Sequence, residues 1–431
     1  MKIIPFMGIT MFGLAIAAQA GVDLSKTLLR GSTDLDPLTY RVGQEMIFTI
    51  AVDYQGQTPD TAYYLSWFRT GDDGKTGQGL APIAPDRPVT VKTAMAKSGF
   101  VRVRAVLSRE DGTPLRFKNE RNQTLEVVFD GGAGAAAETL KGSDEPADFD
   151  EFWAKQKKKL AAVPLKFHLE KHPNSTAHHY IYKVRVDCAG PRPVTGYLVV
   201  PAGAAPKSLA AIAYYQGYGV SAPKAPHGAE NRLVFHVNAH GVELEKDQAY
   251  YADFENQIKS NGQSYAFDPT QNREPENSYF NGMALRVMRS LEFLRALPEW
   301  NGKELVAYGG SQGGLQSVWG AALDHSVTKC VSNITWCCDL SGHEKSGRLN
   351  GWRPKYTPGL DYYDAINHAK RVQCPVEVRA GLGDYVCPPS GLAILYNQLS
   401  APKKIIWSQG ATHGYTPPSV QSFVQENPLP Q

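Results

Sequence analysis

The stretch that decides the fold is Leu305-Val306-Ala307-Tyr308-Gly309-Gly310-Ser311-Gln312-Gly313. Its apolar start predicts a buried strand, and residues 314–323 predict a helix. A Gly-x-Ser-x-Gly between a strand and a helix is typical of a nucleophile elbow, in which a strained turn lifts the serine oxygen clear of the sheet. The glycines leave room for the neighbouring backbone. The stretch therefore predicts that Ser311 is a nucleophile, with an ordinary loop serine as the alternative.

The acid and the histidine that such a serine needs can be found by elimination, because in an α/β-hydrolase both follow the serine along the chain. Residues 374–382 predict a buried strand, and Asp384 follows its carboxyl end, where the site of an open parallel sheet lies. Beyond Asp384 only one histidine remains, His413, in a loop after the strand-like run 403–407. We expect His413 to take the proton of Ser311 and Asp384 to orient the imidazole.

Two backbone N–H groups should then stabilise the tetrahedral oxygen. One is expected to be that of Gln312, the residue after the nucleophile. Residues 210–215 predict an earlier strand, and its exit loop is Gln216-Gly217-Tyr218-Gly219. We expect the N–H of Tyr218 to be the second donor, with a plain glycine turn as the alternative.

At this point the sequence resembles a known family. Residues 309–314 (Gly-Gly-Ser-Gln-Gly-Gly), residues 383–390 (Gly-Asp-Tyr-Val-Cys-Pro-Pro-Ser) and residues 148–153 (Asp-Phe-Asp-Glu-Phe-Trp) are similar to the acetyl xylan esterase and cephalosporin C deacetylase family, carbohydrate esterase family seven. The resemblance runs from Pro146 to Thr416. Members of that family are serine esterases that remove acetyl groups from sugars, so the resemblance implies an acetylated oligo- or polysaccharide as substrate. Spacing alone implies only acyl transfer.

The sequence departs from the family at two places. Where the family usually has Arg-Gly-Gln, this chain has His240-Gly241-Val242, and the family's His-Glu pair is His413-Gly414 here. Neither change removes an expected catalytic residue. Both affect the family's supporting hydrogen bonds, its ring-shaped assembly and its substrate range, so a homo-oligomer stays an open expectation.

Three interpretations remain open. The first is an exported serine esterase that deacetylates carbohydrate, and the second is an esterase or peptidase of the same fold that acts on another acyl group. The third is a non-catalytic carbohydrate-binding relative that has lost its activity, against which the intact Ser311, Asp384 and His413 argue. For the substrate pocket we expect His240 and Trp336, on loops near the carboxyl edge of the sheet, to contact the sugar, with packing as the alternative role.

The amino terminus predicts export. The apolar run Ile3–Ala17 follows Met1-Lys2 and precedes Ala18-Gln19-Ala20, which has the small-x-small form of a signal peptidase site. Residues 1–20 are therefore predicted to be a signal peptide. The run is shorter than the roughly 20 residues that span a bilayer, so we expect a secreted or periplasmic protein without a membrane anchor.

Composition excludes several classes of function. The chain has 431 residues, of which 42% are hydrophobic and 20% charged, and its net charge of +3 does not indicate nucleic acid binding. Six cysteines are too few for a disulfide scaffold. Cys330 and Cys374 each open a predicted strand of one sheet, which allows a bridge between them, but we favour buried free thiols. His236 and His240 lie four apart on a predicted strand, too far apart to share a metal. We expect neither a metal nor a cofactor.

The chain divides into three parts after residue 20. Residues 21–130 contain short alternating runs at 46–52, 63–68, 100–107 and 124–129, which predict a small β-sandwich of immunoglobulin-like kind. We favour a spacer role for it over carbohydrate binding or a lid. Residues 131–145 begin with a Gly/Ala run and are predicted to be a linker. Residues 146–431 alternate strands and helices, and predict an α/β-hydrolase domain with a mostly parallel sheet, an opening hairpin at 180–186 and 195–200, and a helix at 283–297.

Overall fold

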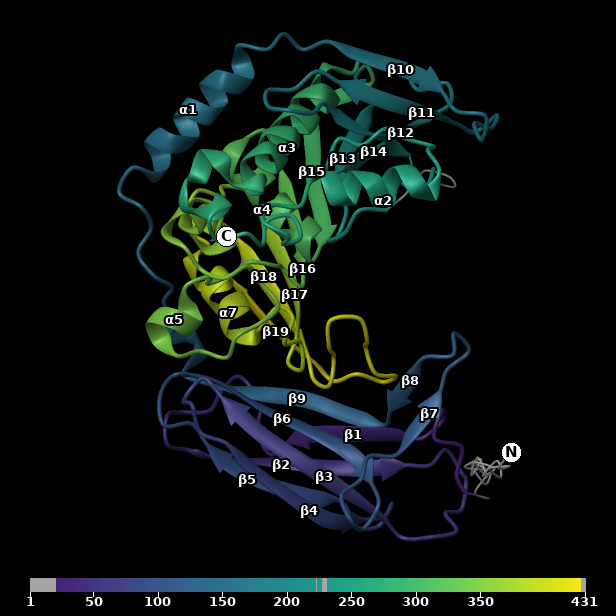
Figure 1. Ribbon diagram of the computed structural model, residues 1–431, viewed down its shortest axis with the longest axis vertical. Helices are drawn as coiled ribbons and strands as arrows, with labels where there is room; N and C mark the ends of the chain where they lie inside the picture. The colour runs from purple at the N-terminus through teal and green to yellow at the C-terminus, as the bar shows by residue number, and fades with distance from the viewer. Residues whose placement is uncertain (1–20, 222, 227–230, 428–431) are drawn as a thin grey trace, which may run out of the picture.

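The computed structural model describes residues 21–221, 223–226 and 231–427, and it arranges them in two parts (Figure 1). The smaller part is built from the first strands of the chain, and the larger one contains a long sheet with helices. The expected signal peptide, residues 1–20, lies outside the described residues. No helix of the described ranges is long and apolar enough to cross a membrane.

The amino-terminal part is rich in β-structure. Among the described residues, its strands form a sheet of order β1-β2-β5, a sheet of order β4-β3-β6-β9 and the pair β7-β8. One apolar core, which includes Phe48, Leu65 and Val103, contacts strands of both larger sheets. Each of the four expected runs falls in a strand, although the last is divided between β8 and β9. The bounds are β1 Leu28–Thr33, β2 Glu45–Asp53, β3 Tyr63–Gly71, β4 Gly77–Ile83, β5 Val89–Ala94, β6 Gly99–Ser108, β7 Arg116–Lys118, β8 Thr124–Glu126 and β9 Val128–Ala135.

The prediction that a linker begins at residue 131 is wrong, because residues 131–135 are the buried end of β9 and pair with β6. The glycines there allow close packing instead of flexibility. A Cβ on Gly132 would lie 2.5 Å from the carbonyl oxygen of Val101 and 2.9 Å from that of Leu382, which belongs to the larger part. Gly132 also exchanges two hydrogen bonds with the side chain of Gln409, of 3.0 and 2.9 Å. Strand β9 therefore docks directly on the larger part.

The larger part is built on one mixed sheet. Its order among the described residues is β10-β11-β12-β14-β13-β15-β16-β17-β18-β19. The strands from β14 to β18 run parallel, and β10, β11, β12 and β19 add antiparallel pairs at the edges, so the expected parallel centre and opening hairpin are confirmed. The bounds are β10 Phe167–Lys171, β11 His179–Val186, β12 Val194–Pro201, β13 Leu209–Tyr215, β14 Arg232–Asn238, β15 Trp300–Gly310, β16 Lys329–Asn333, β17 Val376–Gly381, β18 Lys403–Ser408 and β19 Ser422–Asn427.

Helices pack on this sheet and join its strands. Helix α3 contacts β13, β14 and β15, and α4 contacts β13, β15 and β16. Every residue of α4 is buried, so this helix lies at the centre of the larger part. The apolar stripe predicted at 283–297 lies on α3, except that the helix ends at Ala296 and Leu297 is already extended. The bounds are α1 Phe149–Ala161, α2 Gln248–Gln257, α3 Tyr279–Ala296, α4 Gln312–Leu323, α5 Gly342–Ser346, α6 Ala365–Ala369 and α7 Pro389–Gln398, with short 3-10 turns at Ala137–Thr139, Gln271–Arg273, Pro275–Asn277 and Pro358–Tyr362.

The cysteines are not paired. All six lie in the described ranges and are free thiols, as we favoured from the sequence. Cys330 is the second residue of β16 and is fully buried, and Cys374 precedes β17 and is 7% exposed. Burial raises the pKa of both thiols, so they act as small apolar side chains in the core.

The close packing of β9 generates a testable expectation. Gly132→Ala should lower the free energy of unfolding by about 1–3 kcal/mol, because its Cβ would meet two carbonyl oxygens that belong to fixed backbone. Urea unfolding of the whole chain measures this. Gly77→Ala is the matched control, since a Cβ there would meet nothing closer than 3.8 Å. Equal stability of the two variants would contradict the docking role of Gly132.

Candidate active site

Ser311 lies at the sharp turn between β15 and α4, as the sequence predicted. Its backbone has φ 56° and ψ −120°, a conformation that residues other than glycine rarely adopt. A Cβ on Gly309 would clash with the backbone of Gly313, and one on Gly313 would clash with the carbonyl of Tyr215. The turn is held by a hydrogen bond of 2.9 Å from the Ser311 N–H to the carbonyl of Asn333 on β16. The glycines are therefore required by the close approach of three backbone segments.

His413 and Asp384 meet Ser311 at the carboxyl edge of the sheet. His413 Nε2 lies 3.1 Å from Ser311 Oγ, and His413 Nδ1 lies 2.9 Å from Asp384 Oδ2. Asp384 is fully buried, and its other oxygen accepts the N–H groups of Val386 and Cys387 at 3.0 and 2.9 Å. Because a carboxylate can only accept, Nδ1 carries the proton and Nε2 is free to accept one from the serine. The three residues, far apart in the sequence, form one hydrogen-bonded chain.

The loop after β13 lies beside the elbow. Gln316 Nε2 donates to the carbonyl of Gln216 at 3.1 Å, and Gln312 Nε2 donates to that of Gly217 at 3.3 Å. The N–H of Gln312 lies in the first turn of α4, where no carbonyl of the helix reaches it. The N–H of Tyr218 donates no hydrogen bond to the backbone of the described residues. Within the described ranges, neither of the two N–H groups predicted as donors donates to a backbone carbonyl, and the bonds from Gln312 and Gln316 hold the loop of Tyr218 beside the elbow.

His240 is not exposed to a substrate, which corrects our prediction for its role. It is fully buried, and both ring nitrogens have partners in the protein. Nε2–H donates to the carbonyl of Gly219 at 3.1 Å, and the hydroxyl of Tyr279 donates to Nδ1 at 2.9 Å. Burial, with the charge of Arg286 as a second cause, lowers the pKa of His240 to about 3, so the ring is neutral. The residue supports the loop that carries Tyr218.

Trp336 is also buried, contrary to our expectation of a pocket residue. It is 1% exposed, and its indole N–H donates to the carbonyl of Trp352 at 2.6 Å. The aromatic exposed beside it is Trp352, at 44%, which stacks on Trp336 at 5.4 Å between ring centres and meets the Tyr218 ring edge-on at 4.6 Å. Sequence reasoning missed Trp352. Its signal was a tryptophan among Asn350, Gly351, Arg353 and Pro354, which lack the apolar neighbours of a core position.

One group of side chains in the described ranges could hold a metal ion: Asp384, Cys387 and His413, whose ligand atoms lie within 4.8 Å of one another. Both Asp384 oxygens already accept hydrogen bonds, and His413 Nδ1 faces the carboxylate. The contacts of this group are those that orient a histidine beside a serine.

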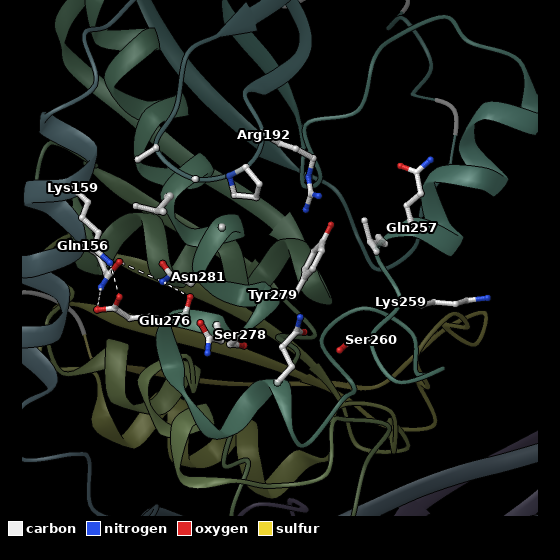
Figure 2. Close-up of a pocket in the computed structure, with 18 residues that line it drawn as sticks. Gln156, Lys159, Arg192, Gln257, Lys259, Ser260, Glu276, Ser278, Tyr279 and Asn281 are labelled. Carbon is white, nitrogen blue, oxygen red and sulfur yellow. Dashed lines mark hydrogen bonds and ion pairs between the residues drawn. The ribbon is translucent and has the colours of Figure 1, made fainter.

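Two of the cavities among the described residues bear on this arrangement. One, of about 960 Å³, contains His413 in its wall and reaches the amino-terminal part. The other, of about 520 Å³, is lined by Arg192, Tyr279 and residues of α3 among others (Figure 2). Figure 2 shows Arg192 and Tyr279 pointing toward one another in it, and Tyr279 is the residue that bonds His240. The second cavity lacks Ser311, Asp384 and His413.

The fold and the elbow define an α/β-hydrolase. Two solved structures support this class. An acetyl xylan esterase from Paenibacillus sp. R4 superposes with a TM-score of 0.54 at 23% identity, over 64% of this chain and 93% of that one. Acetyl xylan esterase 1 from Thermoanaerobacterium sp. JW/SL YS485 superposes with a TM-score of 0.55 at 20% identity, over 64% and 92% of the two chains.

The chain belongs to the acetyl xylan esterase (AXE1) family, whose profile matches residues 137–344 and 355–426. The acetyl esterase Axe7A of Xylanibacter ruminicola is 29% identical over 355 residues, which are 76% of this chain and 74% of that protein. Membership confirms the resemblance found in the sequence and supports a carbohydrate esterase function.

The contacts of His240 generate a prediction about ester hydrolysis. His240→Ala should lower kcat by roughly tenfold or more, because the loop that presents the Tyr218 N–H loses one of the hydrogen bonds that hold Gly219. His240→Gln should recover part of the loss, since an amide can donate to the same carbonyl. The loss should be equal between about pH 5 and pH 9, because a histidine with a pKa near 3 is neutral throughout that range.

The matched control for this prediction is His236→Ala, since that ring packs on Tyr214 and bonds neither Gly219 nor Tyr279. Initial rates of ester hydrolysis across the pH range measure all three variants. A loss in His240→Ala that disappears at one end of the range, or an equal loss in His236→Ala, would contradict the positioning role.

Proposed function

We propose that this chain is an exported serine esterase that removes acetyl groups from carbohydrate through an acyl-enzyme intermediate. The observation that carries the proposal is the hydrogen-bonded chain from Ser311 through His413 to the buried Asp384. A serine hydroxyl is a weak nucleophile unless a base takes its proton, and the 3.1 Å contact with Nε2 provides that base.

The first half of the reaction transfers the acetyl group to the enzyme. Ser311 Oγ attacks the acetyl carbonyl carbon while its proton moves to His413 Nε2, and the carbonyl oxygen becomes an oxyanion. The N–H groups of Tyr218 and Gln312 stabilise that charge. When the oxyanion collapses, the bond to the sugar oxygen breaks, and the imidazolium gives its proton to that oxygen. The products are a deacetylated sugar and an acetylated Ser311.

The second half repeats the chemistry with water. His413 Nε2 takes a proton from a water molecule that attacks the acetyl carbon, and that proton passes to Ser311 Oγ as acetic acid leaves. The acid then loses its own proton to solvent and becomes acetate. In both halves the Asp384 carboxylate fixes the Nδ1–H tautomer and stabilises the imidazolium. Its own hydrogen bonds to the N–H groups of Val386 and Cys387 keep the carboxylate in place.

Two observations support acetyl as the acyl group and carbohydrate as the substrate. The family match and the similarity to an acetyl esterase favour the acetyl group. The exposed face of Trp352, which lies against Tyr218, offers a flat apolar surface of the kind on which a sugar ring stacks.

The remaining parts of the proposal concern the rest of the chain. Residues 1–20 act as the signal peptide, and the protein is secreted or periplasmic. We propose that the β-rich part, with its sheets β1-β2-β5 and β4-β3-β6-β9, is an immunoglobulin-like sandwich and that the larger part after it is the catalytic domain.

The proposal is tested by acetate release. Residues 21–431 are mixed with acetylated xylo-oligosaccharides, and acetate is measured beside the same reaction with Ser311→Ala. The variant should lose roughly a thousandfold or more in kcat. Ser317→Ala is the matched control, since Ser317 lies on the same helix and bonds only the carbonyl of Gly313. Release of acetate by Ser311→Ala at the same rate as by Ser317→Ala would contradict the proposal.

A second test concerns Trp352. Trp352→Ala should raise KM for an acetylated xylo-oligosaccharide by roughly two- to tenfold, because one aromatic stacking contact contributes about 0.5–1.5 kcal/mol. Trp300→Ala is the control, because Trp300 begins β15 at the opposite end from Ser311. Steady-state kinetics of the two variants give the comparison, and an equal KM in both would contradict a sugar-binding role for Trp352.

A further inference from the structure

The cavity of about 960 Å³ beside His413 lies between the two parts of the molecule. The larger part contributes Gly383, Tyr385, Val386, Gly410, residues 412–416 and Pro418, and the amino-terminal part contributes residues of β1, β6, β7, β8 and β9. Figure 1 shows the loop that follows β18 extending toward β8. We call this cavity the interdomain groove. Because His413 lines the groove, a molecule bound in the groove lies next to the reacting ester of the proposed function.

The wall from the amino-terminal part exposes apolar side chains. Leu125 on β8 is 41% exposed, and Phe117 on the paired β7 is partly buried. Opposite them, Tyr415 on the larger part is 47% exposed. Apolar side chains that are left exposed together and bordered by polar groups are typical of a binding groove.

The charges in the groove are balanced. Its lining contains Arg102 and Arg104, together with Asp130 and Glu126. Each arginine forms an ion pair with one of these carboxylates, Arg102 with Asp130 and Arg104 with Glu126 at 3.0 Å. A lining with paired charges and apolar side chains suits a neutral ligand that has both hydroxyl groups and apolar faces.

The groove is preformed because its two walls are fixed to one another. The side chain of Gln409 exchanges hydrogen bonds with Gly132, and Arg30 Nη1 donates to the carbonyl of Pro418 at 2.9 Å. The guanidinium of Arg102 lies 4.3 Å from the centre of the Tyr385 ring, across the same boundary. A rigid groove binds without the cost of ordering its walls.

We propose that the interdomain groove binds the sugar chain that continues from the acetylated residue, so the β7–β8 hairpin is part of the substrate-binding surface. The proposal rests on the proposed function. The volume lies near the top of the ~300–1,000 Å³ range of small-molecule sites, far more than an acetyl group needs. Leu125 and Tyr415 contact the apolar faces of the sugar rings, and Arg104 and Glu126 bond their hydroxyls. The protein therefore acts on a polymer or long oligosaccharide in preference to a small ester.

The test compares two substrates in one variant. Leu125→Asp puts a charge in the groove, and Leu80→Asp is the matched control, since Leu80 is 44% exposed on β4 of the same part and does not line the groove. For each chain kcat/KM is measured with acetylated xylan and with para-nitrophenyl acetate. The ratio of the two values should fall roughly tenfold in Leu125→Asp, through KM for the polymer, and stay within about twofold of wild type in Leu80→Asp.

A ratio that is unchanged in Leu125→Asp, in a protein that hydrolyses both substrates, overturns the groove proposal and leaves the proposed function standing. Failure of the wild-type chain to release acetate from either substrate overturns the proposed function instead.

Binding of xylohexaose is measured separately by calorimetry, with the inactive Ser311→Ala variant as the protein. If Ser311→Ala that also carries Leu125→Asp binds xylohexaose more weakly than Ser311→Ala alone, the groove proposal is supported. Equal binding by the two proteins contradicts it. Sedimentation of wild type and Leu125→Asp must give one mass, because dissociation of an oligomer in the variant would mean that a second copy of the chain covers the groove.

Discussion

The backbone of Ser311, at φ 56° and ψ −120°, is the constraint on which the rest of the site depends. Such a conformation costs on the order of 1–3 kcal/mol, and the surrounding contacts hold it. The Ser311 N–H bonds Asn333, and the Ser311 carbonyl accepts the N–H of Trp336 at 3.1 Å. Glycines on both sides let the turn, β13 and α4 approach without clashing. In this position the serine oxygen faces His413, and the N–H of Gln312 is left without a helix acceptor.

The sequence was sufficient to predict the strand–turn–helix around Ser311 and the hydrogen-bond contacts of Ser311, His413 and Asp384, because strand ends and residue order restrict the choice. It was not sufficient for the surroundings. His240 and Trp336 were expected at the surface because both lie in loops. Neither the loop nor the residue type reveals which other side chains will cover such a residue in the folded protein. The Gly/Ala run after residue 130 was ambiguous for a related reason. Glycine suits a flexible linker and a tightly packed strand equally, and only the contacts of Gly132 distinguish them.

The amino-terminal part acquires a role from the same contacts. Strand β9 docks on the loops that follow β17 and β18, and those loops carry Asp384 and His413. The part that the sequence suggested was a spacer therefore forms one wall of the groove beside the proposed active site. Behind the loop of Tyr218, the buried and neutral His240 links Gly219 to Tyr279. The proposed chemistry thus depends on support from the sheet, from the second part and from a buried polar network.

The central claim is that Ser311 is a nucleophile activated by His413. A fluorophosphonate probe followed by peptide mass mapping tests it most directly, because the probe reacts with activated serines and needs no knowledge of the sugar. The account predicts one adduct per chain, on Ser311, formed at least a hundredfold more slowly in His413→Ala. An adduct on another residue, or labelling of Ser311 at the same rate in His413→Ala, would contradict it.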